Sequence, residues 1–252
     1  MRLYRKLAAC ALFGASLSLA AAQSNGDPDG IPPASRPKLN TSGRTVADFV
    51  PAGWKIDQQA SGDLNGDGRP DVAFVLHGTN KALLMPNESS GDQMFDTNPN
   101  ILGVALANAD GTFTLAGQNG YVVPRWTPGR PTPTFGDALS LTIKNGTLAV
   151  ELTVEPMDPS ITTCIFRYQH SRFELIGYKR WEINPGTQME RTYSVNYSTA
   201  VEVVADAAPG HDATHRLKLP QKPPLALEAV HGMDDLERFA KLGPVPNERW
   251  IQ

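Results

Sequence analysis

Residues 139–152 of the chain are LSLTIKNGTLAVEL, in which apolar and polar residues alternate on both sides of Asn145-Gly146. Strict alternation is typical of a strand with one buried face, because successive side chains point to opposite faces. An Asn-Gly pair between two such runs favours a type I′ turn, whose two central residues both need positive φ angles. This stretch therefore predicts an antiparallel β-hairpin.

Alternating segments joined by turn signals recur along the chain. Three further hairpins are predicted, from residues 101–106 with 112–115, 163–168 with 172–178, and 193–197 with 201–204. The 252 residues include 22 Gly and 21 Pro, a content that is high for a helical protein and favours many turns. The sequence therefore predicts a mainly β fold, with antiparallel hairpins in sequence order.

Helical patterning is confined to the C-terminal end of the chain. Residues 234–241 begin with two aspartates, end with a lysine and precede Gly243-Pro244. This order of charges and helix-breaking residues is expected at helix boundaries. We therefore expect one short helix within residues 226–252.

The first 22 residues have the pattern of a secretory signal peptide. Arg2, Arg5 and Lys6 precede an apolar run that ends in the small residues Ala20-Ala21-Ala22. The run is shorter than the ~20 apolar residues that a membrane span requires. We expect cleavage after Ala22, no membrane span in the remaining chain, and an exported protein that is periplasmic or secreted.

Removal of this segment changes the charge balance and the cysteine count. It holds three of the 23 basic residues and none of the 26 acidic ones, so the remaining chain has a net charge of −6. An acidic chain without a Lys/Arg cluster argues against nucleic acid and anionic membranes as partners. Cys10 leaves with the segment, so Cys164 has no partner for an internal disulfide. Cys164 alternates with Phe166 and Tyr168, which predicts a thiol in the core.

Residues 62–71, GDLNGDGRPD, have the clearest ligand-binding pattern in the chain. Oxygen-bearing side chains stand at positions 1, 3, 5 and 9 of a tight loop, namely Asp63, Asn65, Asp67 and Asp71. Gly68 at position 6 permits a sharp turn, and the backbone carbonyl of Arg69 at position 7 is a natural further donor. Alternate side chains that converge in this way suit a hard cation with six or more oxygen ligands. The pattern predicts Ca²⁺ rather than Mg²⁺, which prefers fewer protein ligands.

Position 12 of the loop separates it from an EF-hand. An EF-hand has a bidentate Glu at that position and continues into a helix. Here the residue is Phe74, and residues 71–76, DVAFVL, have the pattern of a buried strand. An acidic hairpin loop that binds no ion is the alternative interpretation.

A loop of the form D-x-N-x-D-G-x-x-D that runs directly into an apolar strand, here residues 62–76, resembles the FG-GAP or VCBS-type repeat of integrin-alpha-like β-propellers. In that family the loop binds Ca²⁺ between two strands of a blade. The resemblance assigns the ligand positions to Asp63, Asn65, Asp67, the backbone of Arg69, and Asp71. Residues 136–137, 139–148 and 166–178 also resemble single-motif exported bacterial proteins of this type. Integrin-like propellers carry several copies of the loop and this chain has one, so we expect a partial β-propeller-like fold or an open β-meander.

Three other groups of residues carry side chains that are common in binding or catalytic sites. His211 and His215 are four residues apart, but they follow Pro209-Gly210 with no Glu between them, which favours a surface loop over a zinc site. Glu151 and Glu155 would lie ~13 Å apart along a strand, beyond the ~5–10 Å of paired catalytic carboxylates. Trp126 lies in a Pro-rich, basic segment, which favours a structural cover over the sheet and leaves a recognition surface as the alternative.

The sequence thus predicts four segments: the signal peptide (1–22), a flexible polar tail rich in Pro and Gly (23–43), a calcium-binding β domain (44–225) and a C-terminal segment (226–252). The expected function is an exported, monomeric calcium-binding β protein with structural Ca²⁺, whose partner is a protein or an envelope component. No nucleophile elbow, phosphate-binding loop or complete dinucleotide fingerprint is present, so no catalytic residue is predicted. A secreted hydrolase with an unrecognised active site and an inhibitor or immunity-type partner of an envelope enzyme are the alternatives.

Overall fold

The computed structural model describes residues 31–86, 94–126, 138–154, 159–208 and 210–232. Within these ranges the chain forms fourteen β-strands and three short 3-10 helices, and every strand pairing is antiparallel. The predicted mainly β fold is confirmed. The predicted signal peptide, residues 23–30 of the predicted tail and the predicted helix at 234–241 lie outside the described residues.

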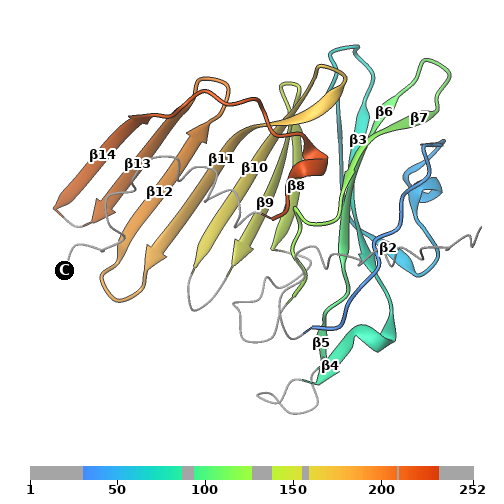
Figure 1. Cartoon of the computed structure of the whole chain (residues 1–252), viewed down its shortest axis with the longest axis horizontal. Coiled ribbons are helices and arrows are strands. Elements are labelled where there is room, and N and C mark those ends of the chain that lie inside the picture. Colours follow the sequence, from blue (N-terminus) through green and yellow to red (C-terminus); the bar gives the residue numbers. More distant parts are fainter. Residues whose placement is uncertain (1–30, 87–93, 127–137, 155–158, 209, 233–252) are drawn as a thin grey trace, which may run out of the picture.

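The larger sheet is an open meander of seven strands in strict chain order (Figure 1). Its strands are β8 (Leu139–Lys144), β9 (Thr147–Val154), β10 (Ser160–Gln169), β11 (Arg172–Asn184), β12 (Met189–Asn196), β13 (Val201–Ala208) and β14 (His211–Lys218). The β8–β9 turn has φ angles of 53° at Asn145 and 69° at Gly146, as the predicted turn requires. The hairpins predicted at 163–178 and 193–204 are β10–β11 and β12–β13. The prediction of an open β-meander is confirmed in this sheet.

The smaller sheet has five strands in the order β1-β7-β6-β3-β2. They are β1 (Ser42–Gly43), β2 (Trp54–Gly62), β3 (Asp71–Gly78), β6 (Asn100–Ala107) and β7 (Phe113–Asn119). The predicted hairpin at 101–115 is β6–β7. A separate two-stranded ribbon pairs β4 (Leu84–Pro86) with β5 (Met94–Asp96). The 3-10 helices are η1 (Val46–Phe49), η2 (Lys81–Leu83) and η3 (Leu227–Ala229).

The main hydrophobic core lies between the two sheets. Ala73 and Val75 of β3 belong to the same buried cluster as Val150 of β9 and Cys164 and Phe166 of β10. The opposite face of β3 is covered by a second cluster, to which Phe49, Phe74 and Leu76 belong. Because both faces of β3 are buried, its sequence is a continuous apolar run rather than an alternating one. Strand β2 also packs against β8.

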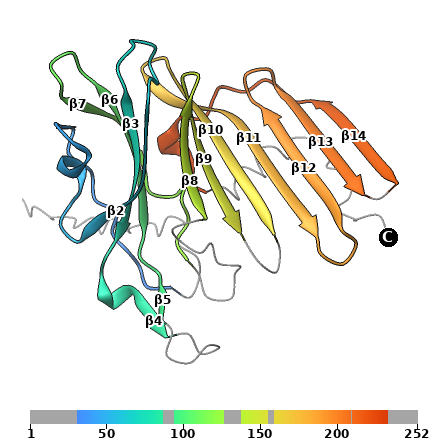
Figure 2. The ribbon, with the colours of Figure 1, turned by 180° about the vertical axis from the view of Figure 1, so that it is seen from behind.

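The far half of the seven-stranded sheet extends away from the smaller sheet, so that β12–β14 lie at the opposite end of the molecule from β2–β7 (Figures 1 and 2). After β14 the chain returns over the sheet to η3, near β7 and β11. Leu219 N–H donates to the carbonyl of Ala200 (2.8 Å), and Leu175 N–H donates to that of Leu225 (2.8 Å). Leu227 is fully buried in the main core, so the core extends past the boundary predicted at residue 225.

The described part of the predicted tail is packed, which corrects the expectation of flexibility for residues 31–43. Leu39 is 6% exposed and belongs to the second cluster, and its N–H donates to Oε1 of Gln118 (2.8 Å). Ser42 and Gly43 pair with β7 as β1. The segment lacks a hydrophobic period because it is held mainly by single side chains and backbone pairing rather than by an amphipathic face.

The described residues contain no helix with the length and apolar character that a membrane crossing requires.

Candidate metal centre

The five residues predicted to bind a cation lie on the loop that joins β2 to β3 and at the first position of β3. The last ladder pair of the hairpin is Gly62 with Asp71, so residues 63–70 form the connection. Gly66 and Gly68 have φ angles of 80° and 81°, a left-handed conformation that glycine adopts without strain. A Cβ on Gly62 would lie 2.6 Å from a methyl group of Ile143 on β8, so the loop begins against the other sheet.

Asp63 and Asn65 organise the first half of the loop through backbone N–H groups. Oδ1 of Asp63 accepts from Gly66 N–H (2.7 Å), and Oδ2 accepts from Gly68 N–H (2.9 Å). Oδ1 of Asn65 accepts from Asp67 N–H (3.0 Å). An ionised carboxylate has about four acceptor positions, so Asp63 keeps acceptor capacity beyond these two bonds.

Asp71 anchors the loop to the neighbouring strand β6. The residue is fully buried, and its Oδ2 accepts from Leu64 N–H (2.8 Å) while its Oδ1 accepts from Ala107 N–H at the end of β6 (2.8 Å). Hydrogen bonds to a charged acceptor are the stronger kind and are costly to lose when the donors are buried. Asp71 therefore fixes the position of the loop relative to its neighbouring strand.

Asp67 and Arg69 form an ion pair inside the loop. Oδ1 of Asp67 accepts from the backbone N–H of Arg69 (2.9 Å), and the Arg69 guanidinium pairs with Oδ2 of the same carboxylate. The hydrogen bond from Arg69 N–H, with those from the Asn65 amide and the guanidinium, lowers the pKa of Asp67 against the effect of burial. Nε of Arg69 also donates to the carbonyl of Ala107 (3.0 Å). The sequence pattern predicts the backbone carbonyl of Arg69 as a cation ligand. It does not predict the ion pair that the Arg69 side chain forms with Asp67.

The donor set is chemically suited to a hard cation, with three carboxylates and one amide within nine residues. In the described part of the chain, no three His, Cys, Asp or Glu side chains converge closely enough to hold a metal ion. The loop is instead closed by its own hydrogen bonds and by the Arg69 guanidinium. A cation bound by Asp67 would therefore compete with that guanidinium for the carboxylate.

A second polar cluster, not found from the sequence, lies around His77 near the other end of β3. Nδ1 of His77 lies 2.8 Å from Oδ1 of Asn100, and Nε2 lies 2.9 Å from Oδ2 of Asp96. Burial alone would raise the pKa of Asp96, but hydrogen bonds from His77 and from Asn98 outweigh it and lower that pKa. Both imidazole nitrogens of His77, which is 5% exposed, face oxygen atoms. The cluster thus holds the ring of His77 at both nitrogens.

The histidines, glutamates and tryptophan that the sequence singles out form no further metal site in the described part of the chain. His211 and His215 lie on β14 rather than in a loop, so the loop prediction is wrong, and their Cα atoms are ~13 Å apart along the strand. Glu151 accepts a hydrogen bond from Thr163 on the neighbouring strand (3.1 Å), whereas Glu155 lies outside the described residues. The ring of Trp126 is stacked on Phe95, with 3.5 Å between centroids, and is 4% exposed, as a cover requires.

Cys164 is fully buried in the main core, as predicted. Burial raises the pKa of its thiol, so the reactive thiolate is disfavoured. The same burial removes it from contact with solvent, so it packs as a small apolar side chain.

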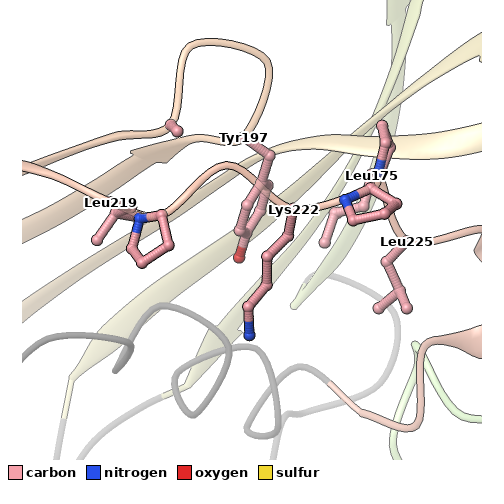
Figure 3. A pocket seen from close by; sticks show the side chains of 9 residues that line it. Leu175, Tyr197, Leu219, Lys222 and Leu225 are labelled. Carbon is pink, nitrogen blue, oxygen red and sulfur yellow. The ribbon is translucent and has the colours of Figure 1, made fainter.

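An apolar pocket lies where the returning chain crosses β11 and the turn between β12 and β13 (Figure 3). Leu175, Leu219 and Leu225 line it, together with Tyr197 and Lys222. Burial raises the pKa of Tyr197. Tyr197 and Lys222 supply the polar side-chain atoms of the lining.

Comparison with known proteins adds no relative. No protein-family model, curated protein or solved structure matches the chain.

Proposed function

We propose that this protein is an exported calcium-binding β protein in which Ca²⁺ stabilises the β2–β3 loop, and that it binds another protein or an envelope component. The observation that carries the calcium proposal is the position of the predicted ligands on one hydrogen-bonded hairpin loop. Asp63, Asn65 and Asp67 alternate along it, and Asp71 holds its base. The signal-peptide pattern of residues 1–22 supports export.

The residues that would hold the ion are Asp63, Asn65, Asp67 and Asp71 through side-chain oxygens and Arg69 through its carbonyl. Bound Ca²⁺ would supply positive charge to a loop that carries three carboxylates and a single arginine. The role is structural, because the loop joins two strands whose register is already set by the ladder. We favour a binding function over catalysis because the polar groups of each of the two described clusters are hydrogen-bonded to one another.

Thermal unfolding of the purified protein with Ca²⁺ and with chelator tests the calcium proposal. A ligand at about 100 times its Kd stabilises the folded state by about 2.7 kcal/mol. For a chain of this length that corresponds to a rise in Tm of about 5–10 °C. Asp67→Ala should remove most of the rise. Asp110→Ala is the matched control, because Asp110 is an exposed aspartate that accepts from Thr112 N–H in the adjoining β6–β7 turn. Equal melting temperatures with and without Ca²⁺ would refute the site.

Arg69→Ala separates the two proposed roles of that residue. The backbone carbonyl is retained and the guanidinium that competes for Asp67 is removed. We expect the Ca²⁺-dependent rise in Tm to persist or to increase. Loss of the rise in this variant would show that the Arg69 side chain supports the loop rather than competing with the ion.

The partner is sought by capture from an envelope extract on the immobilised protein, with Ca²⁺ and with chelator. A protein retained only with Ca²⁺, and lost with Asp67→Ala, would support both parts of the proposal. A protein retained equally under both conditions would support binding and separate it from calcium. Turnover of ester, glycan or peptidoglycan substrates by the purified protein would contradict the binding role and favour the hydrolase.

A further inference from the structure

Strand β14 is the outermost strand of the seven-stranded sheet and is not covered by another described strand. From Asp212 to Lys218 every side chain is exposed except the half-buried Ala213, and Leu217 is 37% exposed. Its pairing with β13 is regular over eight residues, without a bulge. A regular edge strand of this length presents a row of backbone N–H and C=O groups to a further strand.

The edges of the smaller sheet, and the other edge of the larger one, differ from β14. Strand β2 has a register shift between Ile56 and Gln58 and packs against β8, the outer strand at the opposite end of the larger sheet. Strand β1, at the other edge of the smaller sheet, has only two residues. Bulges, short length and coverage are three protections of a sheet edge, and among the described residues β14 has none of these; its protection against an unrelated strand is the charge of Asp212, Arg216 and Lys218.

The two faces of β14 have different chemistry. Ala213, His215 and Leu217 pair with Asp206, Val204 and Glu202 of β13, so they share the face that continues into the main core. Asp212, Thr214, Arg216 and Lys218 lie on the opposite face. The strand therefore has one weakly apolar face and one face with an acid at its start and bases at its end.

We propose that β14 is a self-association edge on which a second copy of this chain adds its own β14, giving one continuous antiparallel sheet. A two-fold axis normal to the sheet keeps the faces matched, so only residues of the same face can oppose each other. With His215 on the axis, Asp212 opposes Lys218 of the second copy and Ala213 opposes its Leu217. An Asp212–Lys218 pair therefore lies at each end of the interface.

Neighbouring registers are less complementary. A shift that places Arg216 on the axis brings two guanidinium groups together. A shift that places Thr214 on the axis pairs Asp212 with Arg216 but leaves Leu217 opposite His211, so the apolar pair is lost. Opposite charges and apolar pairs stabilise cross-strand contacts, and like charges destabilise them. The charge pattern therefore selects a second copy in the register centred on His215.

Sedimentation velocity of the purified protein, from low to high micromolar concentration, tests the proposal. We expect a monomer–dimer equilibrium that high salt weakens, whereas the sequence alone predicts a monomer at all concentrations. Lys218→Asp creates two like-charge pairs per dimer and should weaken dimerisation roughly tenfold. Adding Asp212→Lys should restore it, because the exchanged charges again oppose each other.

Lys179→Asp is the matched control, since Lys179 is an exposed lysine on the outer face of β11 away from the edge. It should leave the equilibrium unchanged. Because Lys218 also donates to the carbonyl of Thr199 (2.8 Å), melting temperatures are measured for every variant. A monomer at all concentrations in low salt would overturn the proposal. Failure of the double exchange to restore association in a folded protein would overturn the register.

Discussion

Replacement of Asp71 by alanine removes the anchor that ties the β2–β3 loop to β6. The fully buried carboxylate accepts from Leu64 N–H and from Ala107 N–H, each at 2.8 Å. A hydrogen bond to a charged group contributes about 1.5–3 kcal/mol, and a buried donor left without a partner adds its desolvation cost. The Ala107 bond is only partly buried, so water can replace the lost acceptor there. We expect a loss of about 3–5 kcal/mol in the free energy of unfolding, or roughly 6–20 °C in Tm.

Urea unfolding followed by tryptophan fluorescence measures this loss, with chelator present so that the effect of hydrogen bonding is separated from that of Ca²⁺. Asp71→Asn keeps one acceptor oxygen and should lose less than Asp71→Ala, which also provides a folded variant if the alanine protein does not fold. Asp110→Ala in the exposed β6–β7 turn should cost about 1 kcal/mol or less. A loss at Asp71 no larger than that at Asp110 would refute the anchoring role.

Three further predictions concern the buried residues Gly103, Cys164 and Glu202. Gly103→Ala would place a Cβ 2.5 Å from the fully buried ring of Phe74, so we expect a loss of about 1–3 kcal/mol in urea unfolding; an unchanged midpoint would contradict this packing. The buried thiol of Cys164, whose pKa is raised by burial, should react with a thiol reagent only at the rate of unfolding, and rapid labelling of the native protein would show otherwise. Burial raises the pKa of Glu202, so the folded state holds its proton more tightly and stability falls as pH rises from the ordinary glutamate pKa through the raised value. Glu202→Gln should remove this slope and increase Tm at neutral pH, where an unchanged Tm would argue against the effect.

Local signals were sufficient for three hairpins of the larger sheet, β8–β9, β10–β11 and β12–β13. The Asn145-Gly146 turn and the alternating segments around it identify β8 and β9, because turn conformation and side-chain alternation both act over a few residues. Strand β14 was missed because its sequence, HDATHRLK, is polar on both faces. An exposed edge strand buries little apolar surface, so backbone pairing rather than hydrophobic pattern defines it.

Contacts between distant segments were beyond the reach of local patterns. Leu39 bonds to Gln118, which is 79 residues away, and Asn119 donates to the carbonyls of Leu227 and Val230. No periodicity within residues 23–43 or 226–232 encodes these contacts. The packed parts of both segments therefore differ from the flexible tail and separate C-terminal segment that the sequence predicts.

The candidate site was predictable in its residues but not in its internal bonding. The spacing of Asp63, Asn65 and Asp67 identifies a loop in which alternate side chains face the same turn. The spacing contains no information about Ala107, since the strand that supplies it is 36 residues from Asp71. The pairing of the Arg69 guanidinium with Asp67 depends on that same neighbouring strand, whose carbonyl fixes Nε.

The return of the chain from β14 to η3 determines when folding can be completed. Leu227 and Val230 are fully buried in the core formed with β6 and β7, and the Asn119 amide of β7 bonds to both of their carbonyls. During synthesis from the N-terminus, the strands of the smaller sheet are made first. Leu227, which completes their core, follows Asn119 of β7 by more than 100 residues. Contacts of such long sequence separation form late and slow the folding of β proteins. Translation or transport must deliver nearly all of the described chain before the native core can close.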